Sequence, residues 1–194
     1  TKQTSALTLH GSAEALSMVS LFADAGANGQ YDGEPLLTPT FAAAADGTWT
    51  TELSLAAGTY ALHVFTTDAA GNNSAVSALT TLVVDDVAPS ITNVALGSSV
   101  GLVNGYLNAG DQALIALTLS EDVVVDTTGG TPTIELDIGG AIVLANYLSG
   151  SGSNSLLFGY TIIGGLNDSD GISVEANGLA LHSGVITDVA GNDL

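Results

Sequence analysis

Apolar residues alternate with polar or small residues in several short runs, and this period of two is the feature that most limits the fold. The clearest run is Ile134, Leu136 and Ile138, which alternate with Glu135 and Asp137. Such spacing places successive side chains on opposite faces of a β-strand. The runs are bounded by Gly, Asn and Asp, which favour tight turns. The chain is therefore expected to consist of short strands joined by loops.

Other runs follow the same pattern, and no long segment shows the 3.6-residue period and the caps of a helix. Ala42–Ala45 is the best short helical candidate, but it lies between a Pro-containing loop and the Asp46-Gly47 turn. We expect it to be strand or loop, and the fold class to be all-β. Further strands are expected at Tyr60–Phe65, Thr80–Val84, Ile91–Leu96, Ile115–Leu119 and Leu156–Ile162.

The chain is expected to divide near Asp85–Pro89, between the closing strand of a first domain and the opening strand of a second. This connection is short, contains no Gly and is stiffened by Pro89. We expect two β-domains, at residues 1–87 and 88–194, that are held in a limited range of orientations.

A weak internal repeat supports this division. The sequence Asp-Ala-Ala-Gly-Asn at 68–72 recurs as Asp-Val-Ala-Gly-Asn at 188–192, each time after an expected strand. In the first half another strand follows, from about Ala75 to Val84, whereas the second half continues only to Leu194. If the halves are analogous, the second domain lacks its closing strand.

The charge balance is extreme, with 20 Asp and Glu residues against the single cation Lys2 and a formal net charge of −19. Almost no carboxylate can find an ion-pair partner, so the acids must be solvated, accept hydrogen bonds or bind cations. Clustered carboxylates repel each other, and a divalent metal ion would remove that repulsion. The charge disfavours nucleic acid and anionic membrane surfaces as partners, because their recognition needs Lys and Arg. The chain has no Cys, and no apolar run is long enough to span a membrane.

The first candidate metal site is the loop at 24–34. It has Gly29 where a Ca²⁺-binding loop makes its sharp turn, and it resembles an EF-hand-like loop. It departs from that pattern at Gly26, where an acid or amide is expected, and its last acid comes one position early. A polar hairpin loop is the alternative. The candidate ligands are Asp24, Asn28, Asp32 and Glu34.

The second candidate is the junction between the domains. Asp85 and Asp86 follow the closing strand of the first domain, and Asp68 and Asn72 lie on the turn before that strand. We expect the four side chains to lie at the same end of the domain, where Ca²⁺ would fix the angle between the domains. The alternative is a solvated turn in which Asp68 and Asn72 cap backbone groups.

The third candidate lies in the second half, where Asp168 and Asp170 offer two carboxylates on the same side of the chain. Sequence alone does not establish which loops meet them. An Asp-Gly dipeptide at 170–171 is also an ordinary turn signal. The residues that could join from neighbouring loops are Glu121, Asp122 and Asp188, with the amides of Asn167 and Asn192.

Neither a zinc site nor an enzyme active site is expected. His10, His63 and His182 are widely spaced and show no zinc-ligand pattern, and His63 is expected to be a strand residue whose ring is satisfied. The Gly-x-Ser-x-Gly segment at 97–101 is not followed by an expected helix, so it does not form a nucleophile elbow. Glu121 and Asp122 do not suit a glycosidase pair, because adjacent strand residues point to opposite faces.

Several segments resemble tandem repeats of bacterial surface proteins. Four segments of the first half resemble bacterial Ig-like repeats: Gly11–Phe22, Ala45–Thr50, Leu55–Leu62 and Thr67–Ser74. Four segments of the second half resemble another repeat type of the same proteins: Ala109–Asp111, Leu119–Asp122, Asp168–Ile172 and Ile186–Asn192. Such repeats occur in giant RTX-type adhesins and biofilm-associated proteins. The Gly-rich nonapeptide repeats of the RTX secretion region are absent from this sequence.

The resemblance implies two tandem Ig-like β-sandwiches, the second Ig-like or cadherin-like, in a protein secreted to the bacterial cell surface. It also implies Ca²⁺ as the bound metal and neighbouring domains of the same chain as partners. We therefore expect a Ca²⁺-stabilised extender that projects adhesive modules from the cell, with no direct membrane insertion. One alternative is a module that binds a glycan or peptide, and another is a salt-adapted acidic spacer without Ca²⁺.

Overall fold

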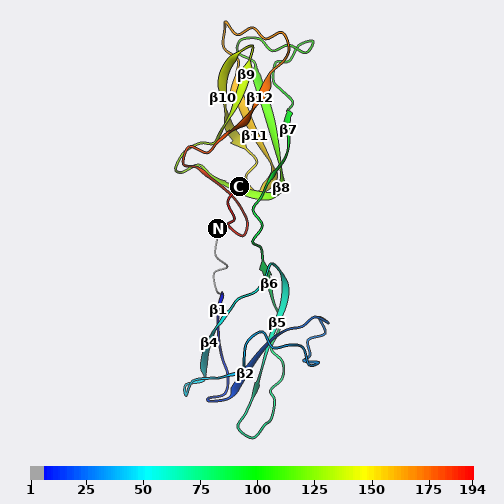
Figure 1. The fold of residues 1–194 in the computed structure, drawn as a ribbon, viewed down its shortest axis with the longest axis vertical. Helices are drawn as coiled ribbons and strands as arrows, with labels where there is room; N and C mark the ends of the chain where they lie inside the picture. The colour runs from blue at the N-terminus through cyan, green and yellow to red at the C-terminus, as the bar shows by residue number, and fades with distance from the viewer. Residues whose placement is uncertain (1–6) are drawn as a thin grey trace. The chain divides into compact units, whose positions relative to one another are not determined.

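The computed structural model describes residues 7–194, and these consist of strands, turns and loops, which confirms the predicted all-β class. The chain divides into two compact units, unit 1 at Thr1–Asp86 and unit 2 at Val87–Leu194 (Figure 1). Lys2 lies outside the described residues. Within 7–194, no helix has the length and apolar character that crossing a bilayer requires.

Unit 1 is built from two antiparallel sheets. One sheet pairs β1 (Leu7–Ser12) with β4 (Thr48–Leu53). The other has the order β3-β2-β5-β6 and contains β2 (Met18–Ala23), β3 (Phe41–Ala42), β5 (Gly58–Thr67) and β6 (Thr80–Val84). The segment expected to be strand or loop at 42–45 begins with the end of β3 and continues into a turn.

The central strands β2 and β5 are buried on both faces. On one face Leu21 and Leu62 pack with Leu53 of the other sheet, and each of the three is at most 4 % exposed. On the opposite face lie Phe22 and Phe65, which the loops after β2 and β5 cover. These loops therefore cover an apolar face of the sheet, as a second sheet does in a β-sandwich.

The closing strand of unit 1 returns along the whole of β5. After the turn at 68–72, Ser74 N donates to Thr66 O and Ser77 N donates to Val64 O, both at 2.8 Å. Strand β6 then pairs with the first half of β5, and its last residue Val84 lies opposite Gly58. Strand β6 thus ends where β5 begins.

Unit 2 forms one continuous sheet that folds over on itself, with the order β12-β9-β10-β11-β8-β13 and β7 also paired with β8. The long strand β8 pairs with β7 and β11 along its first half, meets β11 again at Val123, and pairs with β13 along its last four residues. The strands are β7 (Ile91–Leu96), β8 (Gln112–Asp126), β9 (Thr133–Ile138), β10 (Ala141–Ser149), β11 (Ser153–Thr161), β12 (Ser173–Ala180) and β13 (Val185–Asp188).

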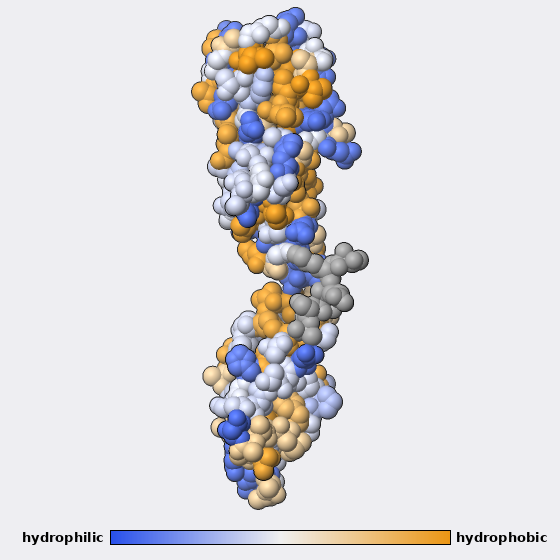
Figure 2. Space-filling view, turned by 90° about the vertical axis from the view of Figure 1, so that its left-hand side faces the viewer, coloured by the Kyte–Doolittle hydropathy of each residue, from blue (hydrophilic) through white to orange (hydrophobic). Residues whose placement is uncertain are grey.

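The core of unit 2 follows the predicted alternation. Ile115 and Leu117 of β8 pack with Ile134 and Leu136 of β9 and with Phe158 of β11, and all five are at most 2 % exposed. Strand β7, by contrast, is exposed along its length because it has only β8 as a neighbour. Figure 2 shows the apolar patches that unit 2 presents on its visible surface.

Unit 2 ends with the same backbone course that follows the turn of unit 1. Asp193 bridges back to Thr187, and Leu194 N donates to Ile186 O at 3.0 Å. The residues after the second turn therefore run antiparallel to β13, as the segment 73–77 runs along β5.

Candidate metal sites

The first repeated turn is closed by the carboxylate of Asp68. Its Oδ1 accepts hydrogen bonds from the backbone N of Ala70 and Asn72, and its Oδ2 accepts one from Asn72 Nδ2, each at 2.8 Å. The amide side chain of Asn72 is the main reason why the pKa of Asp68 lies below its ordinary value, and the backbone N–H of Asn72 adds to the effect. The ionised carboxylate of Asp68 therefore stabilises this exposed turn through its hydrogen bonds.

This turn does not lie beside the acids of the junction. Asp68 directly follows Thr67, the last residue of β5, whereas Asp85 and Asp86 follow β6, whose end pairs with the first residue of β5. The two pairs lie at opposite ends of a ten-residue strand. The prediction that all four side chains share one end is wrong, because the segment after the turn travels back along all of β5.

The second repeated turn has the same hydrogen bonds. Asp188 Oδ1 accepts from Asn192 N at 2.8 Å, and Asp188 Oδ2 accepts from Asn192 Nδ2 at 2.7 Å. Gly71 and Gly191 each have a φ of 88°, a conformation that favours Gly. Unlike the first turn, this one is buried, with 2 % of Asp188 and 8 % of Asn192 exposed. Burial raises the pKa of Asp188, but the hydrogen bonds from Asn192 outweigh it and hold the pKa below its ordinary value.

A second carboxylate lies beside Asp188. In the register of β13 and β8, Asp188 is opposite Val123, so both point to the buried face. Glu121 precedes Val123 by two residues and therefore lies on the same face. Carboxylate oxygens of Glu121 and Asp188 lie within 4.8 Å of each other. Asn192, which bonds to Asp188, also donates from Nδ2 to Val87 O at 3.4 Å. This contact places Glu121 and Asp188 near the first residue of unit 2.

The donors around Asp188 suit a hard divalent cation. Both ionisable groups are carboxylates, and the nearby amide and carbonyl groups also offer oxygen, the element that Ca²⁺ prefers. The Asp188 carboxylate accepts hydrogen bonds from Asn192 N and Asn192 Nδ2. Residues 7–194 include no Lys or Arg that would neutralise the two carboxylates.

The loop at 24–34 forms a local hydrogen-bond network. Asn28 Nδ2 donates to Asp32 Oδ2 at 2.7 Å, and Asp32 N donates to Glu34 Oε2 at 2.8 Å. These three residues are exposed or half-buried, whereas the side chain of Asp24 is fully buried. Within the described part of the chain, the three carboxylates of this loop do not form a group close enough to share an ion. Metal binding by the four residues together stays a prediction.

Asp168 and Asp170 lie in the loop between β11 and β12. Asp168 Oδ1 accepts hydrogen bonds from Gly171 N at 2.9 Å and Asp170 N at 3.1 Å. The Gly171 N–H is the main reason why the pKa of Asp168 lies below its ordinary value. The close pair Glu121 and Asp188 does not include either residue.

The remaining candidates of unit 2 are Asp122 and Asn167. Asp122 is exposed on β8, and adjacent residues of a strand point to opposite faces, so it faces away from Glu121. The carbonyl of Asn167 lies against Gly139, at the turn between β9 and β10. Within residues 7–194, Asp168 and Asp170 do not form a close carboxylate group with Glu121, Asp122 or Asp188, and metal binding at 168–170 stays a prediction.

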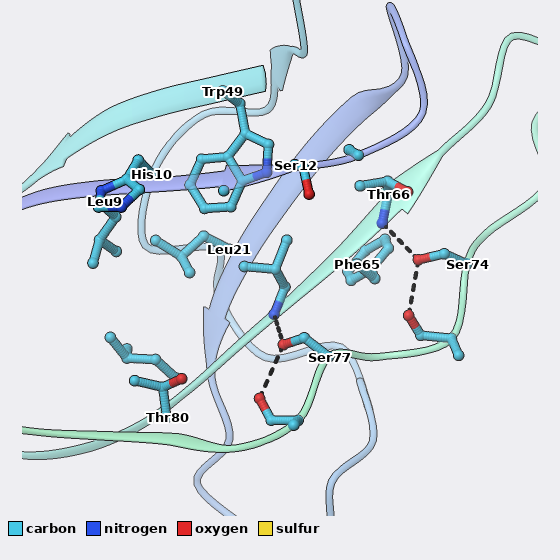
Figure 3. Close-up of a pocket in the computed structure, with 16 residues that line it drawn as sticks. Leu9, His10, Ser12, Leu21, Trp49, Phe65, Thr66, Ser74, Ser77 and Thr80 are labelled. Carbon is cyan, nitrogen blue, oxygen red and sulfur yellow. Dashed lines mark hydrogen bonds between the residues drawn. The ribbon is translucent and has the colours of Figure 1, made fainter. Parts of the chain in front are cut away.

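Unit 1 also contains a groove of about 630 Å³ between its two sheets (Figure 3). Its floor includes Leu21 and Leu62, and the Trp49 indole lines one wall. Ser74 and Ser77 line the other wall, where their hydroxyl oxygens accept hydrogen bonds from backbone N–H groups of β5. The buried Trp49 Nε1 donates to no described residue.

The comparisons with known proteins bear on unit 1. The family model described as "Bacterial Ig-like domain" matches residues 1–86. No curated protein matches the chain. The family match ends at Asp86, the residue at which the compact unit also ends. Over its whole length, unit 1 is therefore similar to a bacterial Ig-like domain.

Proposed function

We propose that this chain is a Ca²⁺-stabilised extender segment of a secreted bacterial adhesin, which projects adhesive modules from the cell surface. The similarity of residues 1–86 to a bacterial Ig-like domain supports a module of a bacterial surface protein. Strand β6 ends at Val84 and strand β7 begins at Ile91, and this short connection supports a spacer, because a long flexible linker would collapse towards random-coil dimensions.

The observation that carries the Ca²⁺ part of the proposal is the pair formed by Glu121 and Asp188. Their carboxylates lie within 4.8 Å of each other on the inner face of β8 and β13. A Ca²⁺ ion bound there would neutralise both charges and would connect β8 to the turn at 188–192. Since Asn192 reaches the carbonyl of Val87, the ion would also brace the first residues of unit 2.

The remaining acids have a smaller part in this proposal. Asp85 and Asp86 are the last two residues of unit 1 and remain predicted donors from the sequence. Asp68 and Asn72 close an exposed turn at the other end of β5, and their geometry is explained without an ion.

Thermal unfolding in EDTA and across a Ca²⁺ titration at fixed ionic strength tests the proposal. A ligand that binds only the folded state at 100-fold excess over its Kd stabilises by about 2.7 kcal/mol. We expect Glu121→Gln to lose most of this Ca²⁺-dependent stabilisation. Glu52→Gln, at an exposed strand position of unit 1, is the control that should keep it. Stabilisation by matched NaCl instead of Ca²⁺ would favour a salt-adapted spacer. Small-angle scattering with and without EDTA tests separately whether Ca²⁺ stiffens the chain.

The alternative is a ligand-binding module, and the groove of unit 1 is the observation that favours it. It offers an apolar floor and the Trp49 indole in one wall, which suit an apolar or ring-shaped part of a ligand. Because Trp49 is the only Trp, a glycan or peptide that enters the groove should change the intrinsic fluorescence. A glycan array in Ca²⁺, followed by fluorescence titration, separates this function from a purely mechanical one.

A further inference from the structure

Asp24 and His63 are brought together beneath the sheet of unit 1. The register of β2 and β5 places Phe22 opposite His63, and Asp24 follows Phe22 by two residues. Asp24 N donates to Ala61 O at 2.8 Å, so the register continues to this point. The side chain of Asp24 is 0 % exposed and that of His63 is 5 % exposed. A carboxylate and an imidazole therefore share one buried face.

The His63 ring is held in one orientation. Its Nδ1 lies 2.8 Å from Ser77 O, and since a carbonyl oxygen only accepts, Nδ1 carries the proton. Phe22 stacks on the ring with centroids 5.6 Å apart. In the neutral imidazole Nε2 is then an acceptor, and it points to the carboxylate of Asp24.

The Asp24 carboxylate is only partly satisfied. Its Oδ2 accepts a hydrogen bond from Gly29 N at 2.7 Å and lies 3.8 Å from His63 Nε2, which is too long for a hydrogen bond. Its Oδ1 is buried and accepts no hydrogen bond from any described residue. A buried carboxylate is costly unless it is paired or coordinates a metal. Two acceptor groups thus face each other across a short gap.

The gap suits one metal ion with a nitrogen and an oxygen ligand. Zinc binds imidazole nitrogen at about 2.0–2.1 Å and carboxylate oxygen at about 2.0–2.2 Å, so one ion can reach both atoms. A donor bond from the other ring nitrogen to a backbone carbonyl is the usual support of a metal-binding His. Ca²⁺ takes oxygen ligands and does not use the imidazole.

Solvent can complete the coordination shell. A cavity of about 360 Å³ adjoins His63 and is lined also by Asn28, Gly29 and Ser77, with Ala27 and other apolar residues. Water that reaches the His63 side of the ion through this cavity would supply the ligands that the protein does not. Asn28 lies at its wall and belongs to the loop that Asp24 anchors through Gly29.

We infer that Asp24 and His63 bind a transition-metal ion of the zinc type, which fastens the loop at 24–34 to β5. This site is separate from the proposed Ca²⁺ site of unit 2, since it uses a nitrogen ligand and no residue of that unit. The ion supplies positive charge to a buried carboxylate whose Oδ1 accepts no hydrogen bond from any described residue.

Calorimetric titration of the whole chain with Zn²⁺, in the presence of excess Ca²⁺, tests this site. We expect one tight equivalent. His63→Gln and Asp24→Asn should each lower the Zn²⁺ affinity by at least about 10-fold, the loss typical even of groups that only support a metal ligand. His10→Gln, at an exposed position of the same unit, should leave the affinity unchanged. Equal affinity in His63→Gln would overturn the assignment.

Nitrogen-15 NMR of the imidazoles provides a test that does not depend on the folding of a variant. In the unsubstituted chain, Zn²⁺ should shift the Nε2 resonance of His63 and leave its protonated Nδ1 in place. A shift confined to His10 or His182 would show adventitious surface binding and would overturn the proposal, as would no shift at all. Glu121→Gln should leave the Zn²⁺ response intact, so failure of the Ca²⁺ site and failure of this one are distinguishable.

Discussion

The turns at 68–72 and 188–192 have nearly the same sequence, the same hydrogen bonds and the same φ at Gly, but their surroundings differ. In unit 1 the turn is exposed at the far end of β5 from the junction acids. In unit 2 it is buried, and Asp188 lies beside Glu121. The comparison teaches that a local motif fixes its own geometry, whereas its chemistry depends on what the tertiary fold places next to it.

Removal of the two carboxylates should give the largest difference between the turns. In Asp188→Ala, the buried N and Nδ2 of Asn192 lose their acceptor, and we expect unit 2 to lose about 3 kcal/mol of stability. In Asp68→Ala the corresponding donors are exposed to water, so the loss should be clearly smaller. Urea unfolding followed by amide NMR signals of each unit measures both, and equal losses would contradict the burial argument.

Added Ca²⁺ should change amide hydrogen exchange in the two turns by almost as different an amount. If the ion binds Glu121 and Asp188, amide hydrogen exchange at 188–192 should slow at 100-fold excess over the Kd by a factor that corresponds to about 2.7 kcal/mol. Exchange at 68–72 should not change. Equal protection of both turns would show that the repeated motif itself binds Ca²⁺ and that Glu121 is not required.

Gly substitutions should instead make the turns look alike. Gly71 and Gly191 share a φ of 88°, so Ala at either position is forced into the left-handed region. We expect each substitution to cost its own unit about 1–2 kcal/mol. Thermal unfolding of Gly71→Ala and Gly191→Ala checks this, and a much larger loss at one position would mean that the two backbones are not equivalent.

Acid should produce the most gradual effect. The folded-state pKa values of Asp68 and Asp188 lie below the ordinary value of about 3.9. Their stabilising contribution is therefore fully present above that pH and is lost as the pH falls through the lower folded-state values. Urea midpoints between pH 6 and 2 should fall more in unit 2, and Asp188→Asn should flatten its profile. A unit 2 midpoint independent of pH would contradict the role of this carboxylate.

Much of the architecture is predictable from local sequence. The expected strands at Thr80–Val84 and Ile91–Leu96 are strands β6 and β7 with the same bounds. The alternating apolar residues of Ile134–Ile138 are buried as predicted, because period-two spacing leaves one face of a strand free to pack. The repeated turns also follow from sequence, since the Asp side chain bonds to backbone groups only two and four residues ahead.

The candidate sites were less predictable, because they depend on contacts between distant residues. The period of two tells which face of its own strand Glu121 or Asp188 occupies. Only the register of β8 and β13 shows that the two residues lie on the same face of the sheet. Likewise, the alternation of β5 puts His63 opposite the face of Leu62, but nothing local identifies Asp24 as its partner. The available sequence signals were a histidine within an expected strand and an acid two residues beyond Phe22.

The sequence by itself determined the all-β class, the strands, the turn chemistry and the excess of carboxylates without cations. These follow from side-chain periodicity, hydrogen bonding over a few residues and composition. Only the tertiary structure decided which acids meet, because a strand can carry a residue to either end of a sheet. The return of the chain along β5 separates Asp68 from Asp85, and the register of β13 with β8 brings Asp188 to Glu121.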